Sequence, residues 1–158
     1  MSKKGIHSYV VLYVLVAVIG VMVLYFGYGA IQDFKERGKT GQLLEFKTWI
    51  EGSINNIASQ NGNMRQETFI APAGVKEVCF VDLDADYIDI NNSYTLIIDS
   101  VESGARKNMF ILGKEIFDSY DVGPITIDNP RAFTCIPVEN GKIKIRMLGE
   151  GIGTKIMS

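Results

Sequence analysis

Two cysteines are the first residues in this chain whose chemistry could matter. Cys79 and Cys135 each lie in a run of residues that predicts a β-strand. They have no CxxC spacing and His7 is the only histidine, so a metal site would lack ligands. Two interpretations stay open. A disulfide would close a loop of about 57 residues and stabilise the fold by about 4 kcal/mol, provided that the compartment is oxidising and the strands are neighbours. Alternatively, the cysteines are two buried free thiols.

Acidic residues are concentrated in the segment DLDADYID. They are Asp82, Asp84, Asp86 and Asp89. A calcium loop of the EF-hand type would need glycine where Tyr87 stands and an acidic residue where Ser93 stands. We therefore predict a solvated acidic loop, with an irregular cation site as the alternative, and assign no metal residues.

A modification signal follows in the same stretch. The triplet Asn91-Asn92-Ser93 fits the acceptor pattern for N-glycosylation. The pattern has meaning only if this part of the chain lies outside the cytoplasm. Asn91 is therefore a candidate glycosylation site.

Catalytic patterns are missing from the sequence. It contains no Gly-x-Ser-x-Gly, HExxH, Walker or Rossmann motif, and His7 precedes a long apolar run. The formal net charge is −2 and the basic residues form no cluster, which argues against nucleic-acid binding. We predict a protein that is not an enzyme, uses no cofactor and does not bind nucleic acid.

The elements that must position these residues begin with an uncharged segment, residues 9–31. As an α-helix it would be about 34 Å long, enough to cross the hydrocarbon core of a bilayer. The apolar run is longer than that of a cleaved secretory signal, and no small-x-small cleavage site follows promptly. We predict a retained transmembrane helix after a short basic head, residues 1–8.

The orientation of this helix is predicted from its flanks. Lys3, Lys4 and the amino terminus precede it, and Lys35, Arg37 and Lys39 follow it, so the positive-inside rule is close to balanced. The head is too short to be a translocated domain, and both cysteines lie beyond the helix. We expect a single-pass membrane protein with a cytoplasmic N-terminus and an extracytoplasmic C-terminal domain.

A second helical pattern covers residues 32–60. Apolar residues recur there at steps of three and four, at Leu43, Phe46, Ile50, Ile54 and Ile57. This spacing predicts an amphipathic helix that continues from the membrane and buries one stripe. Glycines at positions 38 and 41 predict a bend or break between the two halves.

A β domain is predicted for residues 61–158. Strands are expected at 75–83, 94–99, 108–112, 133–138 and 142–148, with a shorter β segment near 67–70. The dipeptide Asn140-Gly141 indicates a hairpin between the last two strands. In the last strand, basic residues alternate with apolar ones, at Lys142, Lys144 and Arg146. This strand is therefore predicted to have one solvent-exposed face. The fold class is thus α+β, with a long N-terminal helix packed on an antiparallel sheet.

The order of these features resembles type IV pilins, particularly the archaeal members. The resemblance rests on the basic head Lys3-Lys4-Gly5, the apolar helix that follows, its amphipathic continuation and the β domain. It implies cleavage by a prepilin peptidase between Gly5 and Ile6, and self-association through the N-terminal helix in a surface filament. Val10 stands at the fifth mature position, where many members carry glutamate.

Two alternatives share this layout. In one, a single-pass anchor presents an extracytoplasmic β domain whose binding role is unknown, with the lipid bilayer as the helix's only neighbour. In the other, the chain is an accessory subunit that docks on other membrane subunits through its amphipathic helix.

Overall fold

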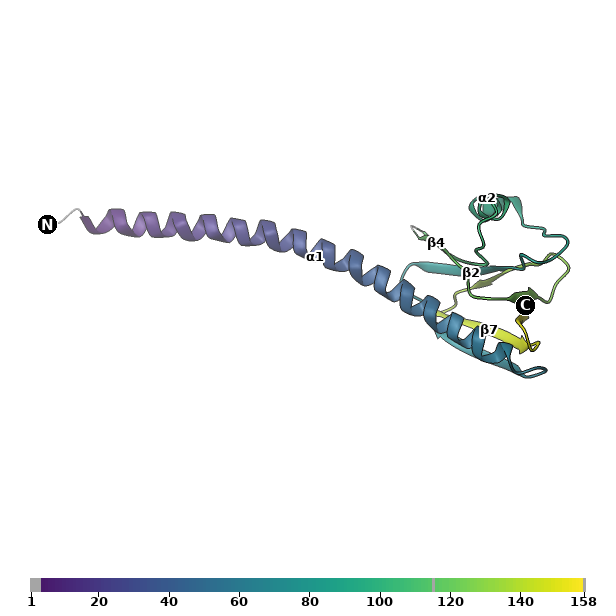
Figure 1. The fold of residues 1–158 in the computed structure, drawn as a ribbon. Helices are drawn as coiled ribbons and strands as arrows, with labels where there is room; N and C mark the ends of the chain where they lie inside the picture. The colour runs from purple at the N-terminus through teal and green to yellow at the C-terminus, as the bar shows by residue number, and fades with distance from the viewer. Residues whose placement is uncertain (1–3, 115, 158) are drawn as a thin grey trace. The chain divides into compact units, whose positions relative to one another are not determined.

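The computed structural model describes residues 4–114 and 116–157, and the side chains of residues 10–28, 40–114 and 116–157. The chain divides into two compact units, Met1–Gly41 and Gln42–Ser158. Helix α1 (Lys4–Ala58) has residues in both units and continues through positions 38 and 41 (Figure 1). The predicted break is therefore wrong, because each of the two glycines costs a helix only about 1 kcal/mol. A bend at these positions stays a prediction.

The second unit holds the β domain. Its described strands are β1 (Met64–Ile70), β2 (Val75–Val81), β3 (Met109–Gly113), β4 (Phe117–Tyr120), β5 (Ile125–Ile127), β6 (Phe133–Pro137), β7 (Lys142–Gly149) and β8 (Thr154–Met157). They form two four-stranded sheets. Sheet A has the order β1-β7-β8-β5, and sheet B has the order β4-β3-β2-β6. The predicted α+β class is confirmed, but there are two sheets rather than one.

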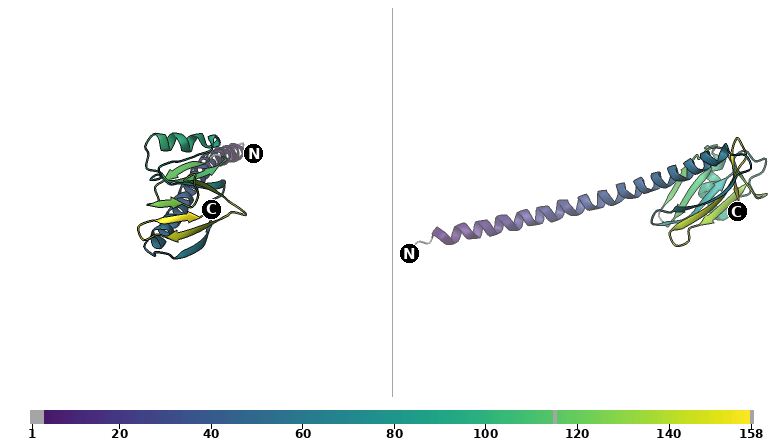
Figure 2. Two further views of the ribbon diagram at one scale, coloured as in Figure 1. Left: turned by 90° about the vertical axis from the view of Figure 1, so that its right-hand side faces the viewer. Right: turned by 90° about the horizontal axis from the view of Figure 1, so that it is seen from below.

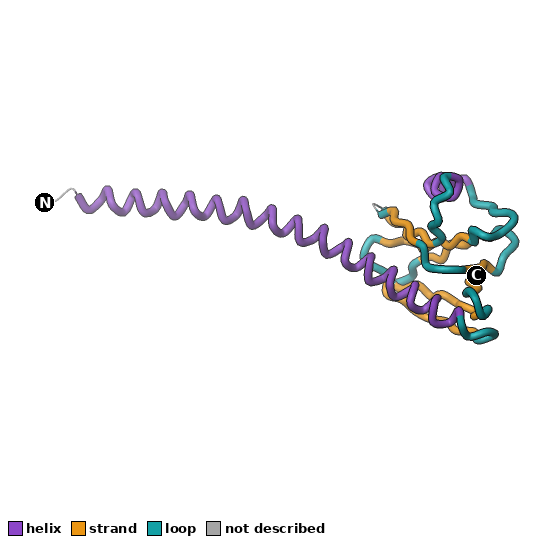
Figure 3. The backbone as a smooth tube through the Cα atoms, in the orientation of Figure 1, coloured by secondary structure: helices purple, strands orange, loops and turns teal. Residues whose placement is uncertain are grey.

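The amphipathic part of α1 provides the main core of this unit. Phe46, Ile50, Ile54 and Ile57 are buried, as their spacing predicts. They belong to one apolar cluster with residues of both sheets, for example Phe69, Val78, Ile111, Ile143 and Ile145. Figures 1 and 3 show this end of α1 alongside the strand β7. The helix stripe thus fills the inner face of the sheets, which neither element could bury alone.

Close contacts fix α1 against sheet A. The Thr154 hydroxyl donates a 2.7 Å hydrogen bond to the Ile54 carbonyl, and Thr154 is completely buried. At the end of β7, a Cβ on Gly149 would collide with the carbonyl oxygens of Ile57 and Gln60. Only glycine allows the strand to approach the helix end so closely.

The last hairpin has the predicted turn. Asn140 and Gly141 have φ values of 52° and 71°, the left-handed conformation that a two-residue hairpin turn of this sequence favours. Ile143, Ile145 and Met147 are buried, and the basic residues between them are exposed. The alternation predicted for this strand is confirmed.

One predicted strand is wrong. Residues 94–99 belong to the short helices η1 (Asn92–Tyr94) and α2 (Thr95–Glu102). Tyr94, Ile97 and Val101 lie three and four residues apart and pack together in a second apolar cluster against the outer face of sheet B. Figure 2 shows α2 on that side. The β-branched residues in this run predicted a strand. The side chains that contact sheet B instead recur at the spacing of a helix.

The sheets are antiparallel except at one edge. β5 pairs with β8 in parallel, in the register Ile125↔Thr154 to Ile127↔Ile156. β4 and β5 were not predicted, because strands of three or four residues are too short to show a period.

Candidate functional site

The apolar part of α1 is the first candidate. Val10–Tyr28 has a mean hydropathy of 2.7, and none of this segment is buried inside the structure. Within the described residues it is the one helix long and apolar enough to cross a membrane. A helix that is apolar on every side needs an apolar environment on every side. The segment is compatible with a membrane anchor.

The predicted cleavage site, between Gly5 and Ile6, lies outside the residues whose side chains the structure describes. Cleavage between them stays a prediction.

The two cysteines form a disulfide. Cys79 in β2 lies directly opposite Cys135 in β6, with 4.0 Å between the Cα atoms. Cys79 is completely buried and Cys135 is half-buried. The disulfide interpretation is confirmed, and the alternative of two free thiols is wrong. The bond joins residues 56 positions apart and links the two strands next to α2.

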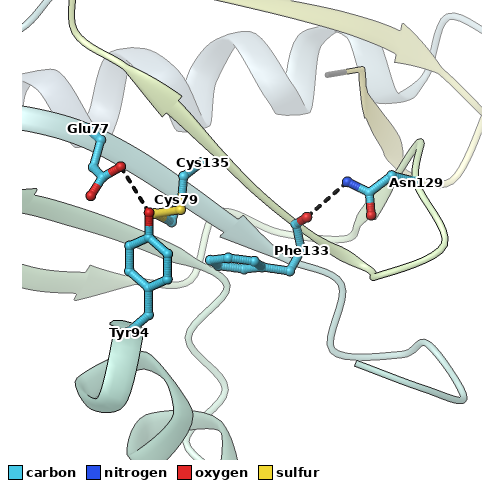
Figure 4. Close-up of a disulfide and its surroundings, with 6 residues drawn as sticks. All are labelled: Glu77, Cys79, Tyr94, Asn129, Phe133 and Cys135. Carbon is cyan, nitrogen blue, oxygen red and sulfur yellow. Dashed lines mark hydrogen bonds between the residues drawn. A yellow bond between two sulfur atoms is a disulfide. The ribbon is translucent and has the colours of Figure 1, made fainter. Parts of the chain in front are cut away.

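An aromatic and a carboxylate lie against this disulfide (Figure 4). The Tyr94 hydroxyl donates a 3.2 Å hydrogen bond to Glu77, and its ring packs edge-on against Phe133. Burial raises the pKa of the Tyr94 phenol above its usual range, and the neighbouring Glu77 carboxylate adds to this shift. The arrangement holds the start of α2 over the bridged strands.

The same carboxylate and the two cysteine sulfurs lie within 4.8 Å of one another. Such a cluster could bind a soft metal ion if the cysteines were thiolates. Because both sulfurs are in the disulfide, the set described here is not a metal site.

The acidic segment forms a loop, which we call the acidic loop (residues 82–90). Asp82 is buried and its carboxylate accepts a 3.1 Å hydrogen bond from the Asp84 backbone NH. Asp84, Asp86 and Asp89 are exposed. Asp89 lies 3.8 Å from the Arg131 guanidinium, a weak and exposed pair.

The glycosylation candidate follows this loop. Asn91 is exposed and caps η1, because its side-chain oxygen accepts hydrogen bonds from the Ser93 backbone NH at 3.0 Å and from the Ser93 hydroxyl at 3.1 Å. The acceptor asparagine and its serine are thus accessible and in contact. Modification of Asn91 stays a prediction.

A groove at the β6–β7 junction was missed by the sequence analysis. We call it the β6–β7 groove. It has a volume of about 600 Å³ and is lined by Thr68, Ile136, Pro137, Glu139, Lys142 and Lys144, among others. The alternating lysines indicated a solvent-exposed strand face in the sequence. The apolar residues of β6 lie beside these lysines only in the folded domain.

A polar cluster on the other end of sheet A was missed as well. Glu150 makes a 2.9 Å ion pair with Lys155 and accepts a 2.8 Å hydrogen bond from the Thr126 hydroxyl. The hydrogen bond from Lys155 holds the pKa of Glu150 below its usual range, and Glu150 raises the pKa of Lys155 in return. These residues come from three segments, so the sequence alone did not reveal the cluster.

Comparisons of the chain with protein-family models, curated proteins and solved structures found no match.

Proposed function

We propose that this chain is a membrane-anchored, pilin-like surface subunit that assembles through its N-terminal helix and has no enzymatic activity. The observation that carries the proposal is the apolar segment Val10–Tyr28, none of which is buried within the chain. Lipid tails can cover such a surface, and so can the same helix of other copies. By the resemblance to type IV pilins, the helix would lie in the membrane before assembly and against the helices of other copies in the filament.

The topology is part of the proposal. The C-terminal unit lies outside the cytoplasm, which the Cys79–Cys135 disulfide supports because disulfides persist in oxidising compartments. The exposed Asn91 is accessible to a glycosylating enzyme on that side. Digestion of intact cells with an added protease tests this: the C-terminal unit should be cleaved or shed without lysis. Protection until lysis would contradict the topology.

The decisive experiment is mass spectrometry of the protein purified from its native membrane. The pilin-like proposal predicts a chain that begins at Ile6. A Gly5→Leu variant should keep the preceding residues, whereas a Ser2→Ala variant should still be cleaved. A native chain that retains residues before Gly5 contradicts the proposal.

Purification in mild detergent separates the remaining alternatives. Stoichiometric co-purification of different membrane proteins would favour an accessory subunit. An uncleaved chain without partners would favour a single-pass anchored β domain.

A further inference from the structure

The acidic loop presents one large aromatic side chain to solvent. Leu83, Ile88 and Ile90 are partly buried against the second apolar cluster and hold the loop in place. Tyr87 between them is 69% exposed. Backbone hydrogen bonds from Asp82 to Ala132 and from Asp89 to Arg131, both 2.9 Å, fix the loop ends. Tyr87 is thus displayed by an anchored loop rather than by a loose one.

Acidic residues flank this tyrosine in the sequence. Asp84 and Asp86 are exposed and make no ion pair with any residue that the structure describes. An aromatic ring beside unpaired charges is a typical interface anchor, because the ring fills a pocket while the charges select the partner.

The β6–β7 groove has the complementary chemistry. Ile136 and Pro137 supply apolar surface. Lys142 and Lys144 are exposed, line the same groove, and have no ion-pair partner among the described residues. Glu139 is the one carboxylate in the described lining and can accept a hydrogen bond from a phenol hydroxyl. A volume of about 600 Å³ is in the range of small-ligand pockets and admits a tyrosine side chain.

The two features lie at opposite ends of one strand pair. In the β2–β6 register, Val81 is opposite Phe133 and Glu77 is opposite Pro137. The acidic loop follows Val81, so it leaves the Phe133 end, whereas the groove lies at the Pro137 end. Four residues of strand separate these ends by about 13 Å. Since the loop is also tied to residues 131 and 132, it cannot reach the groove of its own chain.

We propose that Tyr87 of one copy inserts into the β6–β7 groove of a second copy, with Asp84 and Asp86 pairing with Lys142 and Lys144. The inference rests on the proposed function in that copies gathered in one membrane meet at high local concentration. It adds a contact between β domains to the contact through the N-terminal helix. Because the two surfaces differ, the contact is heterologous and can repeat from copy to copy along a filament.

The test uses the full-length protein in detergent micelles, which shield the apolar helices from one another. Sedimentation should show self-association that weakens as salt rises from about 0.05 M to about 0.5 M, because exposed charges are screened. Tyr87→Ala should weaken it at least about tenfold. Ile152→Ala, which removes another highly exposed apolar side chain (91%), should leave it unchanged.

Charge reversal supplies the decisive comparison. Asp84→Lys/Asp86→Lys and Lys142→Glu/Lys144→Glu should each abolish self-association, because each gives like charges facing one another. An equimolar mixture of the two variants should restore it, since each then offers the other's complement. This recovery cannot come from misfolded protein. The control Asp99→Lys/Glu102→Lys, on the exposed side of α2, should associate normally.

The outcomes separate the inference from the proposed function. Wild-type protein that stays monomeric in micelles, or mixed variants that do not recover, would overturn the docking contact even if the native chain begins at Ile6. Recovery in the mixture together with an uncleaved native N-terminus would overturn the pilin-like function and leave the contact standing.

Discussion

Among single residues, Cys79 and Cys135 are expected to stabilise the fold through their disulfide. Replacing both with alanine should lower the free energy of unfolding by about 2–4 kcal/mol, because the unfolded chain regains the freedom of a 56-residue separation. Urea denaturation of the full-length protein in detergent measures this. Reductant should lower the midpoint of the wild type and leave that of the double variant unchanged. Equal midpoints for oxidised and reduced wild type would contradict the prediction.

Glu150 should give stability a defined pH dependence. Its pKa is lowered in the folded state by Lys155, so its contribution is fully present above the unfolded pKa of about 4.5. The contribution is lost as the pH falls through the lower folded pKa. Glu150→Gln should therefore be less stable than the wild type at pH 7, and the two should converge in acid.

Thermal denaturation of both proteins between about pH 3 and pH 7 checks this expectation. Thr126→Val removes the neighbouring hydrogen bond but keeps the ion pair, and it serves as the control. The Thr126→Val variant should therefore retain most of the pH dependence of stability that the wild type shows. A constant difference between wild type and Glu150→Gln across this range would exclude the assigned cause.

Part of the candidate site could be predicted from residue types alone. The number and context of the cysteines allowed a disulfide, and the Asn91 triplet is a local pattern that needs no fold to be seen. The ion pair of Glu150 with Lys155 lies within one hairpin, but its bond to Thr126 depends on the parallel β5–β8 pairing. Nothing in the local sequence around Thr126 indicates that pairing.

At the scale of elements, two glycines make a matched pair. Gly149→Ala should destabilise the protein by about 1–3 kcal/mol or more, because the added methyl group would press on backbone atoms at the end of α1. Gly52→Ala should instead stabilise it by about 0.5–1 kcal/mol, because its Cβ would meet nothing and alanine favours the helix. Urea midpoints of the two variants should shift in opposite directions. A tolerated Gly149→Ala would mean that α1 and β7 are not so close.

Elements with strong local signals were predicted well. The buried residues Phe46, Ile50, Ile54 and Ile57 of α1 follow the helical period. The Asn140-Gly141 turn defines its hairpin through backbone conformation alone. The segment Thr95–Glu102 was not, because its eight residues carry too little period to separate a strand from a helix. Packing on sheet B decides between them, and that surface does not exist until β2, β3 and β6 have paired.

For the whole molecule, the sequence predicted the order of parts but not how the β domain is divided. An apolar helix, an amphipathic helix and a β domain follow from composition and periodicity. The separation into sheets A and B does not, since long-range pairings such as β1 with β7 leave no local pattern. The β6–β7 groove lies where strands from both sheets meet, and for that reason it too was invisible before the fold was known.

The apolar segment Val10–Tyr28 should determine how the whole protein partitions. If it acts as the proposed membrane anchor, alkaline carbonate or high salt should leave the protein in the membrane fraction, and only detergent should release it. Val14→Lys/Val18→Lys should shift it towards the soluble fraction, since each lysine near a helix centre costs about 2.5–3.5 kcal/mol on insertion scales. Leu44→Lys, an equally apolar and exposed site in the C-terminal unit, should remain membrane-bound. Immunoblots of the carbonate pellet and supernatant distinguish these outcomes. Extraction of the wild type by carbonate alone would show that this helix is covered by protein rather than lipid, and the membrane anchor would have to be abandoned.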